Sequence, residues 1–226
     1  MSKMEFRHEW KHEITYPDLL TLRQRLRAVA RPDRHTIDGK YLIRSLYFDT
    51  PSDRVLREKL DGVSRREKFR IRYYNGDTSV IHLEKKSKLG GLGNKQSADL
   101  SASEVSALLN GDLGWMLDSG RPLVRELYSK MRTQQLRPRT IVDYTREPYI
   151  YPAGNVRVTL DYDIRTGLSR TDFLNPGVTI PAGGAPIILE VKWDAFLPAV
   201  IRDAIQLEGR RACSFSKYAQ CRIYGV

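Results

Sequence analysis

The sequence has few features of a secreted, membrane-spanning or disulfide-stabilised protein. Only 2 of its 226 residues are cysteine. No apolar run reaches the roughly 18 residues that a transmembrane helix requires. The first residues, MSKMEFRHEWKHEI, carry charges where a signal peptide needs an apolar stretch. We therefore expect a reducing, cytoplasmic location.

The two cysteines, Cys213 and Cys221, are predicted to lie in one C-terminal helix. A separation of eight residues along a helix corresponds to roughly 12 Å, which is too far for a disulfide. Both thiols are therefore expected to be free.

Several common catalytic and cofactor-binding motifs are also missing. The chain has no Gly-x-Ser-x-Gly, no Cys/His zinc spacing and no Gly-x-Gly-x-x-Gly after its first strand. Residues 85–95 are rich in Gly and Lys but lack the Walker A spacing, and we interpret them as a loop, either mobile or able to close over phosphates. The histidines show no ligand spacing and are expected to be structural or on the surface: His8, His12, His35 and His82.

Positive charge is what the sequence has in excess. It contains 38 Lys and Arg against 27 Asp and Glu, a formal net charge of +11, with 41% hydrophobic residues. Such a composition is typical of a basic globular protein. Its partner is expected to be nucleic acid, an anionic membrane surface or an anionic small substrate.

The hydrophobic pattern predicts an α+β fold in a single domain, residues 1–226. Helical spacing is found at residues 17–29, 101–111, 122–136, 197–207 and 215–223. Strand patterns are found at residues 4–14, 40–49, 66–75, 78–88, 138–146, 148–152, 155–163 and 186–193. Most of these strands are too close in sequence for helical crossovers, so the sheet should be mainly antiparallel.

Five of the predicted strands place charged residues on one face. The residues that share a face within each strand are Arg7, Glu9 and Lys11; Arg70 and Arg72; His82, Glu84, Lys86 and Lys88; Arg157, Thr159 and Asp161; and Glu190 and Lys192. A half-exposed sheet with a charged outer face explains any single strand. A closed or nearly closed sheet around a cationic channel explains all five, and such a channel would need an anion such as phosphate.

Four acids lie on these cationic faces: Glu9, Glu84, Asp161 and Glu190. They can pair with the neighbouring cations or hold a hard divalent metal through oxygen. Ion pairing is the favoured interpretation for Glu9. Glu190 is the better metal candidate because it interrupts an apolar run, residues 186–191, where burying a carboxylate is costly.

A series of short motifs follows the chain: RHEWK from residue 7, SLYFDT from 45, KFRIRYY from 68, LEKK from 83, YTR from 144, RVTLD from 157, LEVKW from 189 and SFSKY from 214. In this order, over residues 5 to 224, they are similar to the VTC (vacuolar transporter chaperone) polyphosphate polymerase domain family, within the triphosphate tunnel metalloenzymes and related to CYTH proteins. The resemblance implies an eight-stranded, mainly antiparallel β-tunnel with helices packed outside and a C-terminal helix.

The resemblance also implies an enzyme that transfers the γ-phosphoryl group of ATP to a growing polyphosphate chain, with Mn²⁺ or Mg²⁺ bridging the phosphates. By motif, the catalytic residues would be Lys11, Arg70, Arg72, Lys86, Arg146, Arg157 and Lys192. Substrate contacts would come from Arg7, Glu9, Lys88, Lys95 and Lys217. Glu190 would hold the metal, with Glu84 and Asp161 as weaker candidates.

One departure bears on the reaction. Hydrolytic tunnel enzymes begin with Glu-x-Glu-x-Lys, whereas this chain has Arg7 at the first Glu position, which favours transfer over hydrolysis. A triphosphatase or tripolyphosphate hydrolase of the same fold remains an alternative, as does a non-catalytic module that binds polyphosphate or nucleotide. Specific nucleic-acid binding is not expected, because aromatic residues do not alternate with the basic faces. A separate membrane protein for export or storage is an expected partner, and the basic charge favours docking at the inner face of a membrane.

Overall fold

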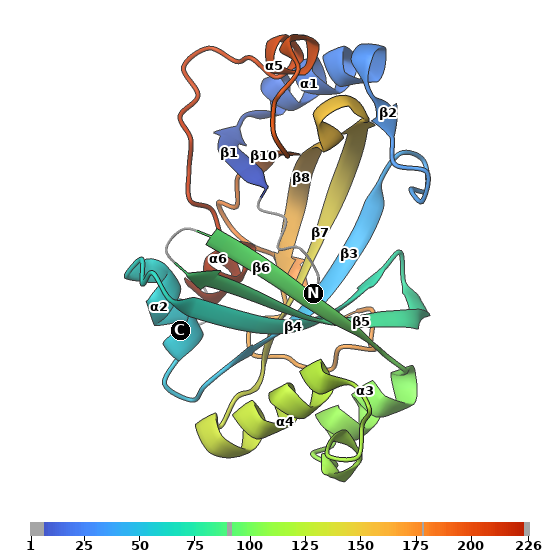
Figure 1. Cartoon of the computed structure of the whole chain (residues 1–226), viewed down its shortest axis with the longest axis vertical. Coiled ribbons are helices and arrows are strands. Elements are labelled where there is room, and N and C mark those ends of the chain that lie inside the picture. The colour runs from blue at the N-terminus through green and yellow to red at the C-terminus, as the bar shows by residue number, and fades with distance from the viewer. Residues whose placement is uncertain (1–6, 90–91, 178, 224–226) are drawn as a thin grey trace. The chain divides into compact units, whose positions relative to one another are not determined.

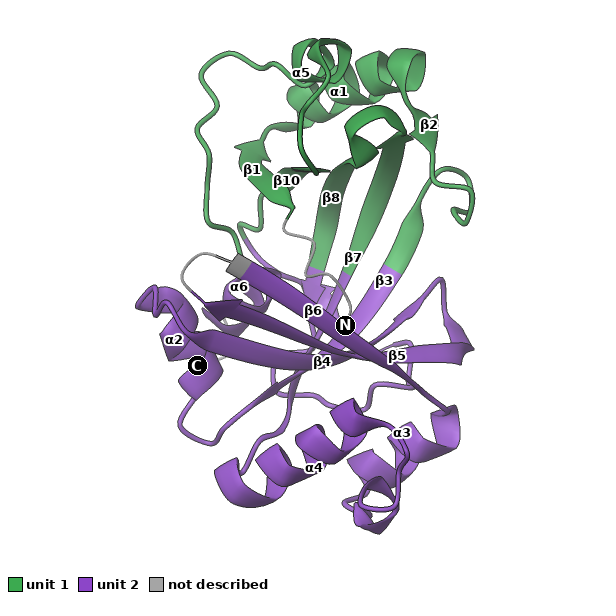
Figure 2. Ribbon diagram, viewed as in Figure 1, with its two compact units in different colours: residues 1–42, 144–164, 184–216 green, residues 43–143, 165–183, 217–226 purple. Residues whose placement is uncertain are grey.

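The computed structural model describes residues 7–89, 92–177 and 179–223 (Figure 1). The chain folds into two compact units, each assembled from separate stretches of sequence (Figure 2). The first unit comprises residues 1–42, 144–164 and 184–216, and the second comprises residues 43–143, 165–183 and 217–226. No helix in the described ranges is long and apolar enough to cross a membrane.

The predicted α+β class with a mainly antiparallel sheet is confirmed. In the described residues the sheet has ten strands, and eight of them follow the order β1-β10-β8-β7-β3-β4-β5-β6, while β2 pairs with β7 and β9 pairs with β8. The strands are β1 (His8–Ile14), β2 (Arg31–Pro32), β3 (Tyr41–Asp49), β4 (Arg66–Tyr74), β5 (Asp77–Leu89), β6 (Leu92–Leu100), β7 (Arg137–Tyr151), β8 (Val156–Thr166), β9 (Ile180–Pro181) and β10 (Ile187–Trp193).

The tunnel sheet was expected to be closed or nearly closed, and among the described residues it is not closed. Strands β1 and β6 stand at the two ends of the hydrogen-bonded order, so the sheet is an open path. Strand β7 is one strand of 15 residues where the sequence suggested two, residues 138–146 and 148–152. The two-residue strands β2 and β9 were not predicted, because so short a segment shows no periodicity.

The predicted loop at residues 85–95 is mostly strand. Strand β5 continues to Leu89, and β6, which was not predicted, begins at Leu92 and pairs with β5 as far as Ile81 opposite Leu100. Glycine and lysine have low strand propensity, but pairing with a neighbouring strand overrides it. Gly90 and Gly91 lie outside the described residues.

The helices are α1 (Tyr16–Val29), α2 (Arg54–Leu60), α3 (Ala102–Leu109), α4 (Pro122–Gln134), α5 (Ala199–Ala204) and α6 (Lys217–Ile223). The predicted capping box from Ser101 to Glu104 begins α3, and a second box, from Thr15 to Asp18, begins α1. Helix α2 was not predicted. Helices α5 and α6 are shorter than expected.

The two cysteines do not share a helix. Cys213 precedes α6, and its backbone N–H donates to the Lys11 carbonyl at 2.8 Å, so this stretch pairs with β1 instead. Both thiols are free, as expected.

In the first unit, one face of the strands packs against helices. Val158 of β8 and Val191 of β10 are buried in a core with Leu22 and Leu26 of α1 and Ile201 of α5. Successive strand residues point to opposite faces. The alternate residues on β8 and β10 therefore project from the other side, where the charged residues lie.

The second unit repeats this arrangement. Phe69 and Ile71 of β4 and Leu83 of β5 are buried, as are Val105 of α3 and Val124 of α4, and both helices contact β5 (Figure 1). The predicted division into an apolar face under helices and a charged face opposite is thus confirmed in each unit.

Candidate anion-binding strand faces

In the second unit, one buried carboxylate holds three cations. Strand pairing places Arg70 directly opposite Glu84, and Arg70 Nε donates to Glu84 Oε2 at 2.6 Å. Lys95 Nζ lies 2.5 Å from Glu84 Oε1, and Arg72 Nη1 lies 3.8 Å from Glu84 Oε2. We call Arg70, Arg72, Glu84 and Lys95 the Glu84 cluster. It carries more positive than negative charge.

The ionisation of Glu84 follows from this environment. The residue is 3% exposed, and burial alone would raise its carboxyl pKa. The charges of Arg70, Arg72 and Lys95 outweigh that effect and hold the pKa well below its usual range. Glu84 therefore remains an anion that aligns its cations, and a surplus of positive charge is left for a ligand.

Tyr47 of β3 belongs to the same face, although the sequence did not single it out. Arg70 Nη1 donates to Tyr47 Oη at 2.9 Å, and Lys68 Nζ lies 5.6 Å from the ring centroid. Burial raises the phenol pKa, but the charges of Arg70, Lys68 and Arg72 lower it to about 7. Ser45, two residues before Tyr47, lies on the same face, and its Oγ accepts a hydrogen bond from Arg72 Nε at 3.0 Å. The period of two along residues 45–47 is the sequence signal that could have identified Tyr47.

The remaining predicted residues of this unit are arranged around the cluster. The strand register places Lys86 between Lys68 on β4 and Lys95 on β6. Three cations side by side across strands repel one another, which an anion would relieve. Lys88 lies opposite Arg66 and Gly93.

Lys217 is the first residue of α6. The next residue, Tyr218, packs its ring against Tyr47 with centroids 5.1 Å apart. The structure thus brings the start of α6 to the side of the sheet that carries Tyr47.

The first unit has a second group of charges, on β1 and β10. The register places Lys11 opposite Glu190 and Glu9 opposite Lys192. Lys11 Nζ lies 3.2 Å from Glu9 Oε1 and 3.4 Å from Glu190 Oε2, while Lys192 Nζ also pairs with Glu190. We call these four residues the Glu190 cluster. Burial lowers the Lys11 pKa, but Glu190 and Glu9 raise it above its usual value.

Arg146 and Asp161 form a separate buried pair. Arg146 Nε and Nη2 donate to the two oxygens of Asp161 at 2.6 and 2.7 Å, and Asp161 has no exposed surface. Burial lowers the Arg146 pKa, yet the Asp161 charge raises it well above its usual value. This fork-like contact uses both carboxylate oxygens.

Arg157 and Thr159 complete the face on β8. Arg157 lies opposite Lys192 and forms a 3.4 Å ion pair with Asp33. Asp33 was not predicted, because it lies in an irregular segment without periodicity. Thr159 lies opposite Glu190, and its buried Oγ1 has no hydrogen-bond partner in the described part of the chain.

Arg7 is engaged elsewhere. Its Nε lies 2.7 Å from Asp194 Oδ1, and its Nη2 donates to the Asn155 carbonyl. The Arg7 guanidinium thus binds one residue just after β10 and one just before β8, and it does not join the Glu190 cluster.

The donor set for a divalent metal is limited. Among the described residues, no three His, Cys, Asp or Glu side chains are grouped as a metal site requires. The oxygens of Asp161 and Glu84 are occupied by guanidinium and ammonium groups. The oxygens of Glu190 also face cations, the ammonium groups of Lys11 and Lys192, so a metal held by Glu190 and the neighbouring Glu9 would have to displace them, and a bound triphosphate would have to supply the remaining oxygen ligands.

The protein is thus an α+β protein whose two units each display a charged strand face organised by carboxylates, with a surplus of cations at the Glu84 cluster and equal numbers of lysines and glutamates at the Glu190 cluster. A family model for the VTC domain matches residues 6–224, so the chain belongs to the VTC domain family. A search of curated proteins gave no match.

One solved structure shares the fold, and another is similar to the chain more weakly. A "putative adenylate cyclase" from Bacillus halodurans is 16% identical, covers 83% of this chain and 80% of its own, and superposes with a TM-score of 0.51. The PH1819 protein from Pyrococcus horikoshii OT3 is 14% identical, covers 88% of this chain and 84% of its own, and gives a TM-score of 0.44. The family match thus shows the family, and the Bacillus halodurans structure shows a shared fold.

Proposed function

We propose that the protein is a metal-dependent polyphosphate polymerase that uses ATP. The observation that carries the proposal is the Glu84 cluster, in which three cations share one buried carboxylate and keep a positive surplus. Membership of the VTC domain family supports a phosphate chain as the ligand. In the proposed reaction, a terminal oxygen of polyphosphate attacks the γ-phosphorus of ATP, the bond to the β,γ-bridging oxygen breaks, and ADP leaves.

The cations of the second unit are assigned to phosphate binding. Arg70 and Arg72 offer planar guanidinium groups that match phosphate oxygens, and Lys86, Lys95 and Lys217 add point charges. Phosphoryl transfer depends mainly on positioning and charge neutralisation, which such groups supply without covalent chemistry. Lys88, at the edge of the paired register, is assigned to the outer part of the same binding surface.

The first unit is assigned to phosphate and metal binding. Lys11, Lys192, Arg146 and Arg157 supply positive charge, and Arg146 is held in place by Asp161. Glu190, with Glu9 beside it, would hold Mn²⁺ or Mg²⁺, which when bound neutralises phosphate oxygens as a Lewis acid. Arg7 is left as a weaker substrate contact because its guanidinium already binds Asp194.

The test is a product assay on the purified protein with ATP and Mn²⁺. Polyphosphate is measured on a stained gel, and ADP and orthophosphate are measured in the same samples. Polymer with one ADP per phosphate added is the expected result. Orthophosphate without polymer would overturn the polymerase in favour of a hydrolase, and binding of polyphosphate without either product would overturn catalysis altogether.

Arg70→Ala and Arg70→Lys separate the roles of shape and charge at the Glu84 cluster. We expect Arg70→Ala to lose most activity while remaining folded, since 21% of the side chain is exposed. Arg70→Lys should keep part of the phosphate affinity, because it retains charge but not the guanidinium fork. Wild-type activity in Arg70→Ala would refute the assignment.

A further inference from the structure

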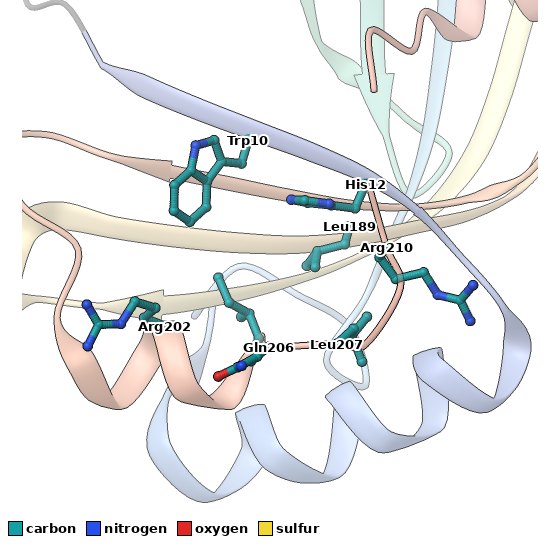
Figure 3. A pocket seen from close by; sticks show the side chains of 8 residues that line it. Trp10, His12, Leu189, Arg202, Gln206, Leu207 and Arg210 are labelled. Atoms are coloured by element: carbon teal, nitrogen blue, oxygen red, sulfur yellow. The ribbon is translucent and has the colours of Figure 1, made fainter. Parts of the chain in front are cut away.

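A pocket lies on the reverse side of β1, within the first unit and away from the Glu190 cluster. Trp10 and His12 line it, and by the alternation of the strand they point opposite to Glu9 and Lys11. The other walls come from β10, α5 and the segment after α5 (Figure 3). Its volume is about 410 Å³, which falls within the roughly 300–1,000 Å³ of small-molecule sites.

The lining is apolar with a small number of polar groups. Trp10, Leu189 and Ile205 supply the apolar surface, and the indole of Trp10 is 43% exposed. Trp10 is held in place by an edge-on contact with Trp193, with centroids 4.6 Å apart. A fixed aromatic surface open to solvent is suited to the flat or aliphatic body of a ligand.

His12 supplies a polar atom without a partner. Its Nδ1 is buried and has no hydrogen-bond partner in the described part of the chain. Figure 3 shows the imidazole beside Leu189 and on the same strand as Trp10. Buried polar atoms are normally satisfied, and a ring nitrogen of histidine donates or accepts according to its tautomer. Because Nδ1 is buried, the imidazole contributes ring surface to the pocket wall.

Two arginines line the pocket, and they differ. Arg210 is already neutralised, because its Nη2 lies 2.6 Å from Asp18 Oδ2. Arg202 is only loosely paired, with its Nε 3.7 Å from Asp203 Oδ1 and 62% of its side chain exposed. Arg202 is therefore the group that would bind an anionic group of a ligand.

We infer that this pocket binds a small organic anion with an aromatic or short aliphatic body and a carboxylate or phosphate group. The body packs against Trp10, and the anionic group pairs with Arg202. The inference does not depend on the proposed polymerase activity, since none of the pocket residues belongs to the Glu84 cluster or the Glu190 cluster.

The experiment is calorimetric titration with phenyl phosphate, phenylacetate and benzyl alcohol. We expect both anions to bind one per chain and benzyl alcohol to bind about tenfold more weakly, as the loss of one charged contact implies. Preference for phenyl phosphate or phenylacetate identifies the anionic group. Failure of both anions to bind would overturn the inference.

Variants locate the binding. Arg202→Gln should weaken both anions about tenfold and leave benzyl alcohol unchanged. Arg211→Gln removes the same charge outside the pocket lining and should have no effect. Trp10→Phe, which keeps an aromatic ring if Trp10→Ala fails to fold, should weaken all three probes. Wild-type affinity in Arg202→Gln and Trp10→Phe would place the binding elsewhere and refute the site.

Discussion

Glu84 Oε2 accepts a hydrogen bond from Arg70 Nε at 2.6 Å, although Glu84 is only 3% exposed. Lys95 approaches the same carboxylate from the neighbouring strand β6, and Arg72 approaches it from β4, the strand that carries Arg70. One buried anion thus fixes the positions of three cations before any ligand arrives. Such preorganisation lowers the cost of binding a phosphate chain.

Replacing Glu84 should make the stability of the protein depend more strongly on a bound anion. Glu84→Gln leaves Arg70, Arg72 and Lys95 without their common partner, so the melting temperature of the free protein should fall. Inorganic tripolyphosphate should raise it by more than in the wild type, because the added anion replaces the lost charge. Glu126→Gln is the matched control, since Glu126 pairs with Lys85 on the other face of β5. Equal ligand-induced shifts in the two variants would contradict the role of Glu84.

Stability should fall in acid because of the same carboxyl group. The folded-state pKa of Glu84 is lowered from its ordinary 4.5, so its stabilising effect is full above that pH and is lost as the pH falls below it. Urea unfolding measured down to about pH 3 should show the wild type losing its advantage over Glu84→Gln. An advantage that stays constant over this range would contradict the shift.

Tyr47 should titrate unusually early. Its phenol pKa is lowered to about 7 from the ordinary 10.0, so the phenolate stabilises the fold increasingly as the pH rises between these values. Ultraviolet absorbance should show one tyrosine ionising near pH 7. Tripolyphosphate should raise this pKa by offsetting the nearby cations. Tyr47→Phe should remove the transition and Tyr16→Phe should retain it; retention in Tyr47→Phe would assign it to another group.

Two arginines of the first unit should differ in their effect on stability. Arg146→Ala leaves the fully buried Asp161 without its partner and should cost roughly 3–5 kcal/mol in the free energy of unfolding. Arg157→Ala breaks a partly exposed pair with Asp33 and should cost no more than about 1 kcal/mol. Chemical denaturation of both variants checks the contrast. Similar losses of unfolding free energy in the two variants would contradict a larger stabilising effect of the Arg146–Asp161 pair.

Metal dependence should be concentrated at Glu190. Glu190→Gln should lose activity and shift the Mn²⁺ titration to higher concentrations, because a carboxylate ligand is replaced by a weaker amide. Glu13→Gln, on the same strand as Glu9 but outside the Glu190 cluster, is the control. Unchanged Mn²⁺ behaviour in Glu190→Gln would remove the residue from the metal site.

Strand alternation in the sequence determined which residues lie on the charged face. Arg70 and Arg72 alternate with buried Phe69 and Ile71, and this period of two sends every second side chain to the same side whatever the register. The capping box at Ser101 and the apolar spacing of residues 17–29 likewise determined α3 and α1, because these signals act between residues close in the chain.

Partners on different strands were decided only by tertiary structure. Lys95 reaches Glu84 because β6 extends through a stretch that composition alone suggested to be a loop, and pairing energy outweighed the low strand propensity of its residues. The open strand order and the participation of Tyr47 likewise depend on long-range register. The sequence by itself determined which side chains are cationic and which face they share, whereas the hydrogen-bonded pairing of distant strands decided which of them meet around one carboxylate.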